Sequence, residues 1–394
     1  MGVPPMAEGT RATTKAPGFA APAGQILVAP DGALRDDGTM LLTCQTGYES
    51  FLKRELEDLG LPVVERGAGW VRSVATNVAP SAPDAPPPLN PDGRPGGRAL
   101  PDLVFAHLAL LEPVELAGDS VNALAQQVGD YFLASLRGEK VVAAWPSVWT
   151  GPHEVVGLGR RVAGVEAAFG ERLRRRFSRV ARLARPELPR GVVGVARGLF
   201  VHFTDFRRAF VTRTAWLGGQ RRMADDPLAP SRSYLKIEEA YALLGHEPQA
   251  GEVVADLGAA PGGWSYSAAK RGARVVAVDN GPLKGGALDH PLVTHRAVDA
   301  FQFRPGAGEV FDWMFCDLVE EPHHVMRHLV APWIEGRWCR RFVVNVKLGR
   351  VDPAAWLRGL RAEDAVFSRH ATAVRVRHLY HDREELTVMG EVRA

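Results

Sequence analysis

The stretch Val254-Ala-Asp-Leu-Gly-Ala-Ala-Pro-Gly-Gly263 joins an apolar run, an acid and a glycine-rich turn. The run Val253 to Leu257 predicts a buried strand, and a helix is expected to begin near Trp264. The glycines of the turn would let the backbone pass close to a ligand, because they carry no Cβ. The stretch therefore predicts one strand–loop–helix unit of an α/β fold with a ligand-binding loop.

The sequence after this unit continues the alternation of strands and helices. Further strands are predicted at Arg274–Val278, Phe311–Phe315 and Phe342–Val346, in a region that begins near Ser231. Such alternation is typical of a parallel sheet with crossover helices. We therefore expect an α/β, Rossmann-like domain in the C-terminal half of the chain.

Two acids in this region indicate which ligand the loop binds. Asp279 ends the second strand, where a carboxylate can accept hydrogen bonds from ribose hydroxyls. Asp256 precedes the turn, where it would repel a pyrophosphate but attract the cationic methionine end of S-adenosylmethionine. The loop also lacks the Gly-x-Gly-x-x-Gly spacing of dinucleotide-binding loops. The predicted cofactor is S-adenosylmethionine, with a nicotinamide enzyme as a less favoured alternative.

The segment from Asp256 to Trp264 resembles the cofactor loop of the FtsJ-like ribose 2′-O-methyltransferases. That resemblance implies a catalytic Lys-Asp-Lys-Glu tetrad. The positions that match it are Lys236, Asp317, Lys347 and Glu384, although the neighbouring Glu385 is hard to separate from Glu384. The resemblance implies that Lys347 accepts the proton.

Three further segments resemble the RlmM branch of this family, the bacterial cytidine 2′-O-methyltransferases of 23S ribosomal RNA. They are Val278–Pro282, Cys316–Glu320 and Leu379–Glu385. The resemblance implies a ferredoxin-like unit over 38–121, a THUMP RNA-binding unit over 122–222 and a class I methyltransferase domain over 223–394. Residues 1–37 carry few large apolar side chains, which predicts a disordered tail. Together with the glycine loop it implies these cofactor contacts: Ser233, Asp256, Gly258, Ala260, Pro261, Gly262, Gly263, Asp279, Asp299 and Asp317.

The chemistry of the reaction explains why two lysines would occur together. A ribose hydroxyl is a weak acid, so its attack on a methyl group needs a base or electrostatic help. Lysine is normally protonated, but burial and a second ammonium group lower its pKa. We therefore expect Lys236 to lower the pKa of Lys347, with Asp317 and Glu384 orienting both. No metal is required, because a sulfonium already activates the leaving group.

The most basic segment of the chain runs from Glu171 to Arg185. A single continuous helix would align Leu173 with Phe177 on an apolar face. The neighbouring stripe would hold Arg172, Arg175, Arg179 and Arg182. Such a stripe suits RNA phosphates, although an ordinary solvated helix face is the alternative.

Composition limits the remaining choices. The formal net charge is only +3 over 394 residues, so any RNA-binding surface must come from local clusters of charge. The three cysteines lack Cys-x-x-Cys spacing, which argues against a disulfide framework or a thiolate zinc site. With no membrane span or signal peptide in the sequence, we expect a cytoplasmic protein without membrane or metal partners. The oligomeric state stays open.

We therefore expect methylation of a cytidine ribose in 23S ribosomal RNA or in a large-subunit precursor. Methylation of another RNA or of a base is one alternative. The tetrad argues against base chemistry, because a base carbon or exocyclic amine needs differently placed groups. An inactive RNA-binding assembly factor is the second alternative, and the complete set of four tetrad residues argues against such decay.

Overall fold

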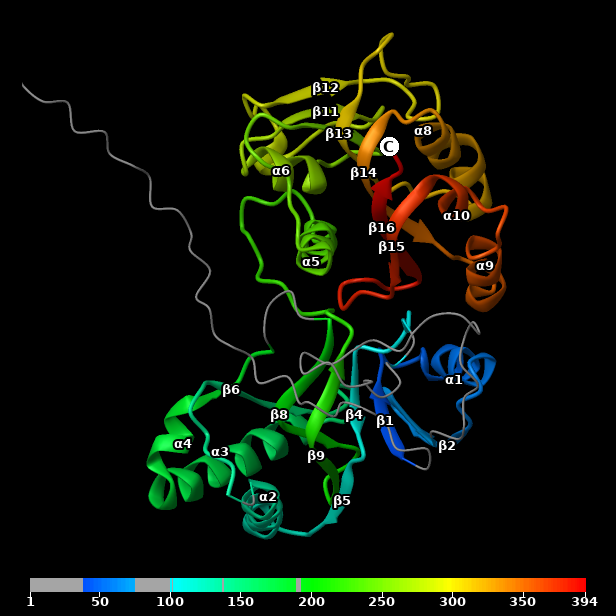
Figure 1. Cartoon of the computed structure of the whole chain (residues 1–394). Helices are drawn as coiled ribbons and strands as arrows, with labels where there is room; N and C mark the ends of the chain where they lie inside the picture. Colours follow the sequence, from blue (N-terminus) through cyan, green and yellow to red (C-terminus); the bar gives the residue numbers. More distant parts are fainter. Residues whose placement is uncertain (1–37, 75–99, 101, 137, 189–192) are drawn as a thin grey trace, which may run out of the picture.

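The computed structural model describes residues 38–74, 100, 102–136, 138–188 and 193–394. The predicted tail over 1–37 lies outside the described residues, as does nearly all of the proline-rich stretch over 79–101. The described chain forms two halves, each built on its own sheet and stacked one above the other in Figure 1.

The C-terminal half contains the expected α/β sheet. Its strands are β10 (Val253–Leu257), β11 (Arg274–Val278), β12 (Val293–Arg296), β13 (Phe311–Cys316), β14 (Cys339–Lys347), β15 (Ala371–Arg377) and β16 (Glu385–Val392). The order in the sheet is β12-β11-β10-β13-β14-β16-β15. Strands β10 to β14 pair in parallel, whereas β16 is antiparallel to both of its neighbours. The prediction of a C-terminal Rossmann-like domain is confirmed.

Helices cover both faces of this sheet. They are α5 (Tyr234–Leu244), α6 (Gly263–Ala269), α7 (Pro322–Val325), the π-helical turn η2 (Met326–Val330), α8 (Ala331–Glu335), α9 (Pro353–Leu360) and α10 (Val366–His370), with a 3₁₀ turn η1 (Gly285–Ala287). Trp313 and Phe315 pack with α5 and α6, whereas Met314 and Cys316 pack with the helices of the other face. Because successive side chains of a strand point to opposite faces, both faces are apolar.

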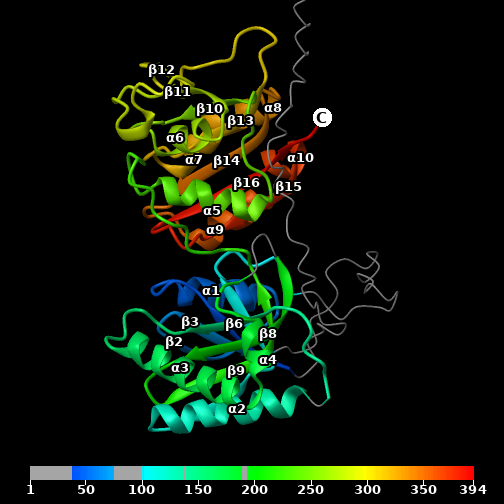
Figure 2. The same cartoon turned by 90° about the vertical axis from the view of Figure 1, so that its left-hand side faces the viewer.

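The N-terminal half is built on a second sheet. Its strands are β1 (Thr39–Thr43), β2 (Val63–Gly67), β3 (Trp70–Val74), β4 (Leu108–Leu111), β5 (Val114–Ala117), β6 (Trp145–Thr150), β7 (Ala184–Arg185), β8 (Gly194–Phe203) and β9 (Arg208–Leu217). Its helices are α1 (Glu49–Asp58), α2 (Val121–Leu136), α3 (Leu158–Arg176) and α4 (Ser178–Leu183). Figure 2 shows α2 and α3 side by side along this sheet.

The sheet of the N-terminal half crosses the predicted boundary at residues 121 and 122. Within the described residues its order is β2-β3-β1-β4-β9-β8-β6-β7, with β5 also pairing with β9. Strands β4 and β5 precede the boundary, and their partner β9 follows it. The proposed ferredoxin-like and THUMP units therefore share one sheet, and their division remains a prediction.

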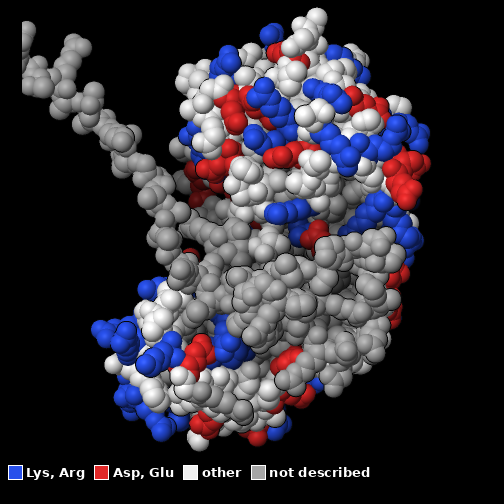
Figure 3. Space-filling view, viewed as in Figure 1, with Lys and Arg blue, Asp and Glu red and all other residues white. Residues whose placement is uncertain are grey.

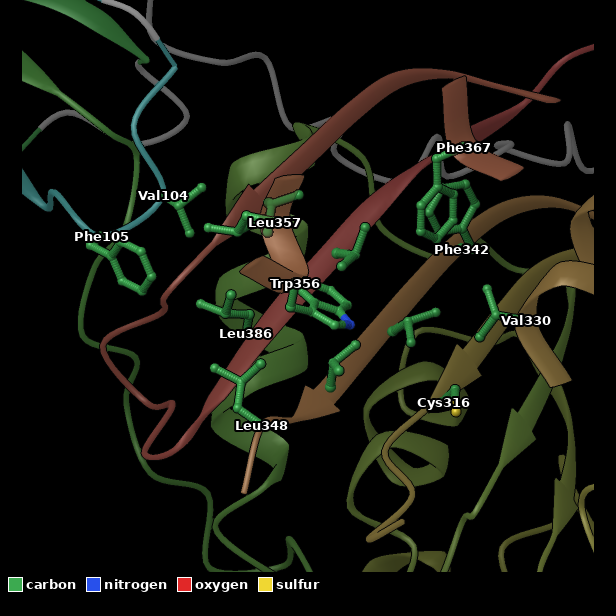
Figure 4. Close-up of a cluster of buried hydrophobic side chains, with 14 of the residues drawn as sticks. Val104, Phe105, Cys316, Val330, Phe342, Leu348, Trp356, Leu357, Phe367 and Leu386 are labelled. Atoms are coloured by element: carbon green, nitrogen blue, oxygen red, sulfur yellow. The ribbon is translucent and has the colours of Figure 1, made fainter. Parts of the chain in front are cut away.

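The two halves share a buried interface. Val104 and Phe105 of the N-terminal half belong to the same apolar cluster as Leu357 and Leu386 of the C-terminal half, and Figure 4 shows these side chains close together. Polar contacts between the two halves accompany these apolar side chains. The buried His107 ring places Nε2 3.0 Å from the carbonyl oxygen of His378, and the wholly buried Arg377 pairs with Asp102. The interface thus fixes the segment that leads into β16.

Candidate active site

Two lysines meet two carboxylates at the carboxyl end of the parallel sheet. Lys236 lies in the first turn of α5, and Lys347 is the last residue of β14. Asp317 follows β13; it pairs closely with Lys347, and its Oδ1 lies 3.9 Å from Nζ of Lys236. Glu385 pairs with Lys236, and its Oε2 lies 3.3 Å from Nζ of Lys347. The fold therefore brings both predicted lysines and the predicted aspartate into one cluster.

The glutamate of this cluster is Glu385, so the choice of Glu384 is corrected. Lys347 and Glu385 are direct partners in the antiparallel register of β14 and β16. Directly opposed residues project to the same face of a sheet, whereas the preceding residue projects to the other face. Glu384 is accordingly exposed, and its carbonyl accepts a hydrogen bond from the Leu348 amide. Strand pairing, which the sequence did not reveal, separates the two glutamates.

The pKa of Lys347 also differs from expectation. Burial lowers this pKa, but the carboxylates of Asp317 and Glu385 raise it by more, so that it lies above its ordinary value. The expected depression of this pKa is therefore wrong for the protein as it stands. The cluster holds two carboxylates for its two lysines, and the attraction to them outweighs the repulsion between the ammonium groups.

The glycine-rich loop follows β10 as predicted, and local contacts hold its shape. Asp279, after β11, accepts hydrogen bonds from the Ala260 amide at 3.0 Å and from the Gly281 amide at 2.7 Å. Gly258 and Gly262 have φ of +82° and +108°, a region that favours glycine. A Cβ at these glycines would lie 2.5 Å from a side-chain atom of Leu318 or Ala287, respectively. Both glycines are therefore also needed for packing within the protein itself.

Asp256 presents a buried acceptor beside this loop. Its Oδ2 accepts a hydrogen bond from Ser265 at 2.6 Å, whereas Oδ1 has no partner among the described residues. Burial, together with the nearby carboxylates of Asp317 and Asp279, raises the pKa of Asp256 to about 7. A buried carboxyl oxygen without a partner is costly unless a ligand satisfies it. The residues therefore fit a cationic ligand such as S-adenosylmethionine.

The other predicted cofactor residues lie at two places. Ser233 precedes α5, and its hydroxyl lies 2.8 Å from that of Ser231. It lines the same cleft as the lysine cluster, together with Ala260, Pro261 and Asp317. Asp299, which follows β12, accepts a hydrogen bond from the Phe301 amide at 2.9 Å and lies outside the lining of that cleft.

The cleft above the lysine cluster has a volume of about 840 Å³ and is lined by both halves of the chain. The N-terminal half contributes Thr150 and His153 from the end of β6 and the loop after it, and His202 from β8. The C-terminal half contributes Arg232 and Arg383, both exposed. None of these five residues was predicted, because no local pattern marks them and only the stacking of the halves brings them together.

The predicted arginine stripe is not one continuous helix. Phe177 has φ −140° and ψ 60°, so it ends α3 and precedes α4; its side chain is 39% exposed. All four predicted arginines are exposed, and Arg175 pairs with Glu171. Lys and Arg gather on the side of the molecule formed by α3 and α4 (Figure 3). The stripe is therefore divided between two helices, and none of its arginines lines the cleft.

Sequence comparisons identify the relatives of this chain. A model described as FtsJ-like methyltransferase matches residues 229–337. The ribosomal RNA large subunit methyltransferase M of Halorhodospira halophila is 35% identical over 354 residues, which cover 88% of this chain and 95% of that relative. The protein of the same name from Xanthomonas oryzae pv. oryzae is 31% identical and covers 89% of this chain and 98% of the relative. The chain belongs to the ribosomal RNA large subunit methyltransferase M family.

Membership of the methyltransferase M family confirms the predicted RlmM resemblance. It makes the chain an enzyme that uses S-adenosylmethionine, in agreement with the residues of the glycine loop. Among solved structures, TrmN from Thermus thermophilus is similar over 90% of this chain and 99% of its own, at 18% identity and a TM-score of 0.32. The family assignment therefore rests on the sequence relatives.

Three further observations apply to the described part of this methyltransferase. No group of His, Cys, Asp or Glu side chains there has an arrangement that could hold a metal ion. No helix there is long and apolar enough to cross a membrane. Cys44, Cys316 and Cys339 are buried free thiols, and burial raises the pKa of Cys316 to about 12, which makes it a poor nucleophile.

Proposed function

We propose that this enzyme methylates the 2′-hydroxyl of a cytidine ribose in 23S ribosomal RNA. The observation that carries the proposal is the cluster in which Lys236 and Lys347 share Asp317 and Glu385 beside the cofactor loop. The names of the relatives support ribosomal RNA of the large subunit as substrate. The choice of a cytidine as the modified nucleotide rests on the resemblance to the RlmM branch.

Asp256 and the glycine loop would hold S-adenosylmethionine, which would supply its sulfonium methyl group to the ribose 2′-oxygen, so that an O–C bond replaces the C–S bond and S-adenosylhomocysteine leaves. The hydroxyl proton passes to Nζ of Lys347, while Lys236 stabilises the negative charge that develops on the oxygen. Asp317 and Glu385 hold both side chains in place.

Lys347 must be neutral before it can accept a proton. Because Asp317 and Glu385 favour its charged form, only a small fraction of the enzyme holds a neutral Lys347 at neutral pH. The proposal therefore implies that kcat rises with pH above neutrality. A purely electrostatic role of a charged Lys347 would instead give a rate that does not rise with pH.

The exposed arginines of α3 and α4 are proposed to bind RNA phosphates away from the cleft. The RNA would then extend from this surface to the cleft between the halves. We further propose that the enzyme acts in the cytoplasm, where bacterial ribosomal RNA is made.

Transfer of tritiated methyl groups to large-subunit RNA that lacks native modification tests this function. Wild-type protein is compared with Lys347→Met and with a control, Lys140→Met, which changes an exposed lysine outside the cleft lining. We expect an alkali-stable 2′-O-methyl cytidine from wild type and control, and no label with Lys347→Met. Label on a base would contradict the ribose reaction, and full activity of Lys347→Met would contradict the role of this lysine.

A further inference from the structure

Asn345 lies between the two lysines and was not among the predicted site residues. It occupies β14 two positions before Lys347, so both side chains project to the same face of the sheet. Its side chain is 1% exposed. Its Oδ1 accepts a hydrogen bond from Lys347 and lies 3.4 Å from Nζ of Lys236. One amide oxygen therefore contacts both ammonium groups of the cluster.

The orientation of this amide is decided by its other end. Nδ2 donates to Oδ1 of Asp382 and to Oγ1 of Thr387, each at 2.9 Å. A flipped amide would turn its N–H groups toward two ammonium groups and its oxygen toward a carboxyl group, and both changes would be unfavourable. Oδ1 of Asn345 must therefore face the lysines.

The acceptors that orient Asn345 are themselves fixed. Thr387 is the direct partner of Asn345 in the register of β14 and β16, and its hydroxyl contacts both carboxyl oxygens of Asp382. Asp382 is buried and accepts a hydrogen bond from the Leu379 amide at 2.9 Å. Asn345, Thr387 and Asp382 form a buried hydrogen-bond network. Within it, the Asn345 oxygen is the atom that contacts the two lysines.

We infer that Asn345 is a positioning residue whose neutral amide oxygen holds the side chains of Lys347 and Lys236 in place. The inference rests on the proposed function. A protonated lysine has three N–H donors. The contacts of Lys347 are Asp317, Glu385 and Asn345, which suit three donors. The third partner is neutral, so it orients the ammonium group without adding another negative charge.

The charged groups around Lys347 show why this neutrality matters. Asp317 reaches it from the end of β13, Glu385 from β16 and Lys236 from α5, while Asp382 lies behind Asn345. A third carboxylate in contact would favour the charged form still further. Loss of the amide oxygen would have the opposite effect, because a hydrogen-bond acceptor that favours the charged form would be removed.

Two substitutions at this position therefore have opposite expected effects. Asn345→Asp keeps the shape but adds charge; we expect the rising limb of the kcat–pH profile to move about one pH unit to the alkaline side, with a kcat about tenfold lower at neutral pH. Asn345→Ala should move the limb to the acid side and lower its plateau, because the lysine is then less well oriented. A merely structural role would lower kcat in both variants without moving the limb.

The control is Thr387→Val, which removes one partner of the Asn345 amide and changes no charge. We expect a smaller loss of kcat and an unmoved limb. Thermal melting and cofactor titration show whether each variant folds and binds S-adenosylmethionine. If Asn345→Asp does not fold, the position of the rising limb in the kcat–pH profile of Asn345→Ala tests the inference alone. Coincidence of the variant limbs with that of wild type would overturn the inference. Product mapping on wild type separately tests ribose methylation, so the two failures are distinguishable.

Discussion

Glu385 lies opposite Lys347 on the paired strands β16 and β14, with its Oε2 3.3 Å from the ammonium group. The same carboxylate pairs with Lys236 on α5, so one side chain joins both lysines. Burial raises the pKa of Glu385, but the two lysines lower it by more, and it stays charged at neutral pH. Glu385 thus supplies half of the negative charge that balances the lysine pair.

This relationship predicts different effects for two adjacent substitutions. Glu385→Gln should lower kcat by about a hundredfold, because both lysines lose a charged partner that orients them. Glu384→Gln is the matched control; its side chain is exposed, and activity within about twofold of wild type is expected. Steady-state methyl transfer measures both. A large loss with Glu384→Gln and none with Glu385→Gln would restore the assignment made from sequence.

Cofactor binding should depend on the ionisation of Asp256. The pKa of this buried carboxyl is raised to about 7, and only its charged form can pair with a cation. As pH rises from 5.5 to 7 the charged fraction of this carboxyl increases to about half, so the affinity for S-adenosylmethionine should rise.

Asp256→Asn should weaken binding about tenfold at pH 7, or about 1.4 kcal/mol. It should also remove the pH dependence between 5.5 and 7. Calorimetric titration measures both effects, and Asp364→Asn, at an exposed acid outside the cofactor residues, serves as control. A variant that retains the wild-type pH dependence would show that another group is responsible.

RNA affinity should depend on the exposed arginines of α3 and α4. Replacing Arg172 and Arg179 by alanine should weaken RNA binding and reduce the slope of log affinity against log salt by about two. Arg369→Ala on α10 is the control, since this arginine is also exposed but lies in the other half. Filter binding at several salt concentrations measures the RNA affinity and its salt dependence for wild type, variant and control. Equal losses in variant and control would assign the effect to net charge alone.

The ion pair between Arg377 and Asp102 joins the two halves, and its partners are unequally exposed. The arginine side chain is 0% exposed and that of the aspartate 56%. Asp102→Ala would leave a buried guanidinium without its carboxylate, which should lower stability by about 3 kcal/mol. Arg377→Met would leave a carboxylate that water can solvate, so about 1 kcal/mol is expected. Urea unfolding compares the two, and a larger loss for Arg377→Met would contradict this reasoning.

Local sequence patterns predicted strands and loops well where the elements are buried and regular. The bounds predicted for β10 and β11 agree with the structure, because both strands are short, largely apolar runs with an acid at or just after their carboxyl end. The prediction of one continuous basic helix was wrong, because the helix is interrupted at Phe177. Most of its residues favour a helix locally, and the break there is a backbone conformation that periodicity does not reveal.

By itself the sequence determined the parallel C-terminal sheet, the glycine loop with Asp256 and Asp279, and three members of the lysine cluster. The sheet and the loop depend on residue types at short spacing, which local periodicity preserves, whereas the members of the cluster were predicted from the resemblance to the FtsJ-like family. Only the tertiary structure selected Glu385 over Glu384, placed Asn345 between the lysines and raised the pKa of Lys347. Each of these depends on which strands pair and which charges meet, and those contacts join residues far apart in the chain.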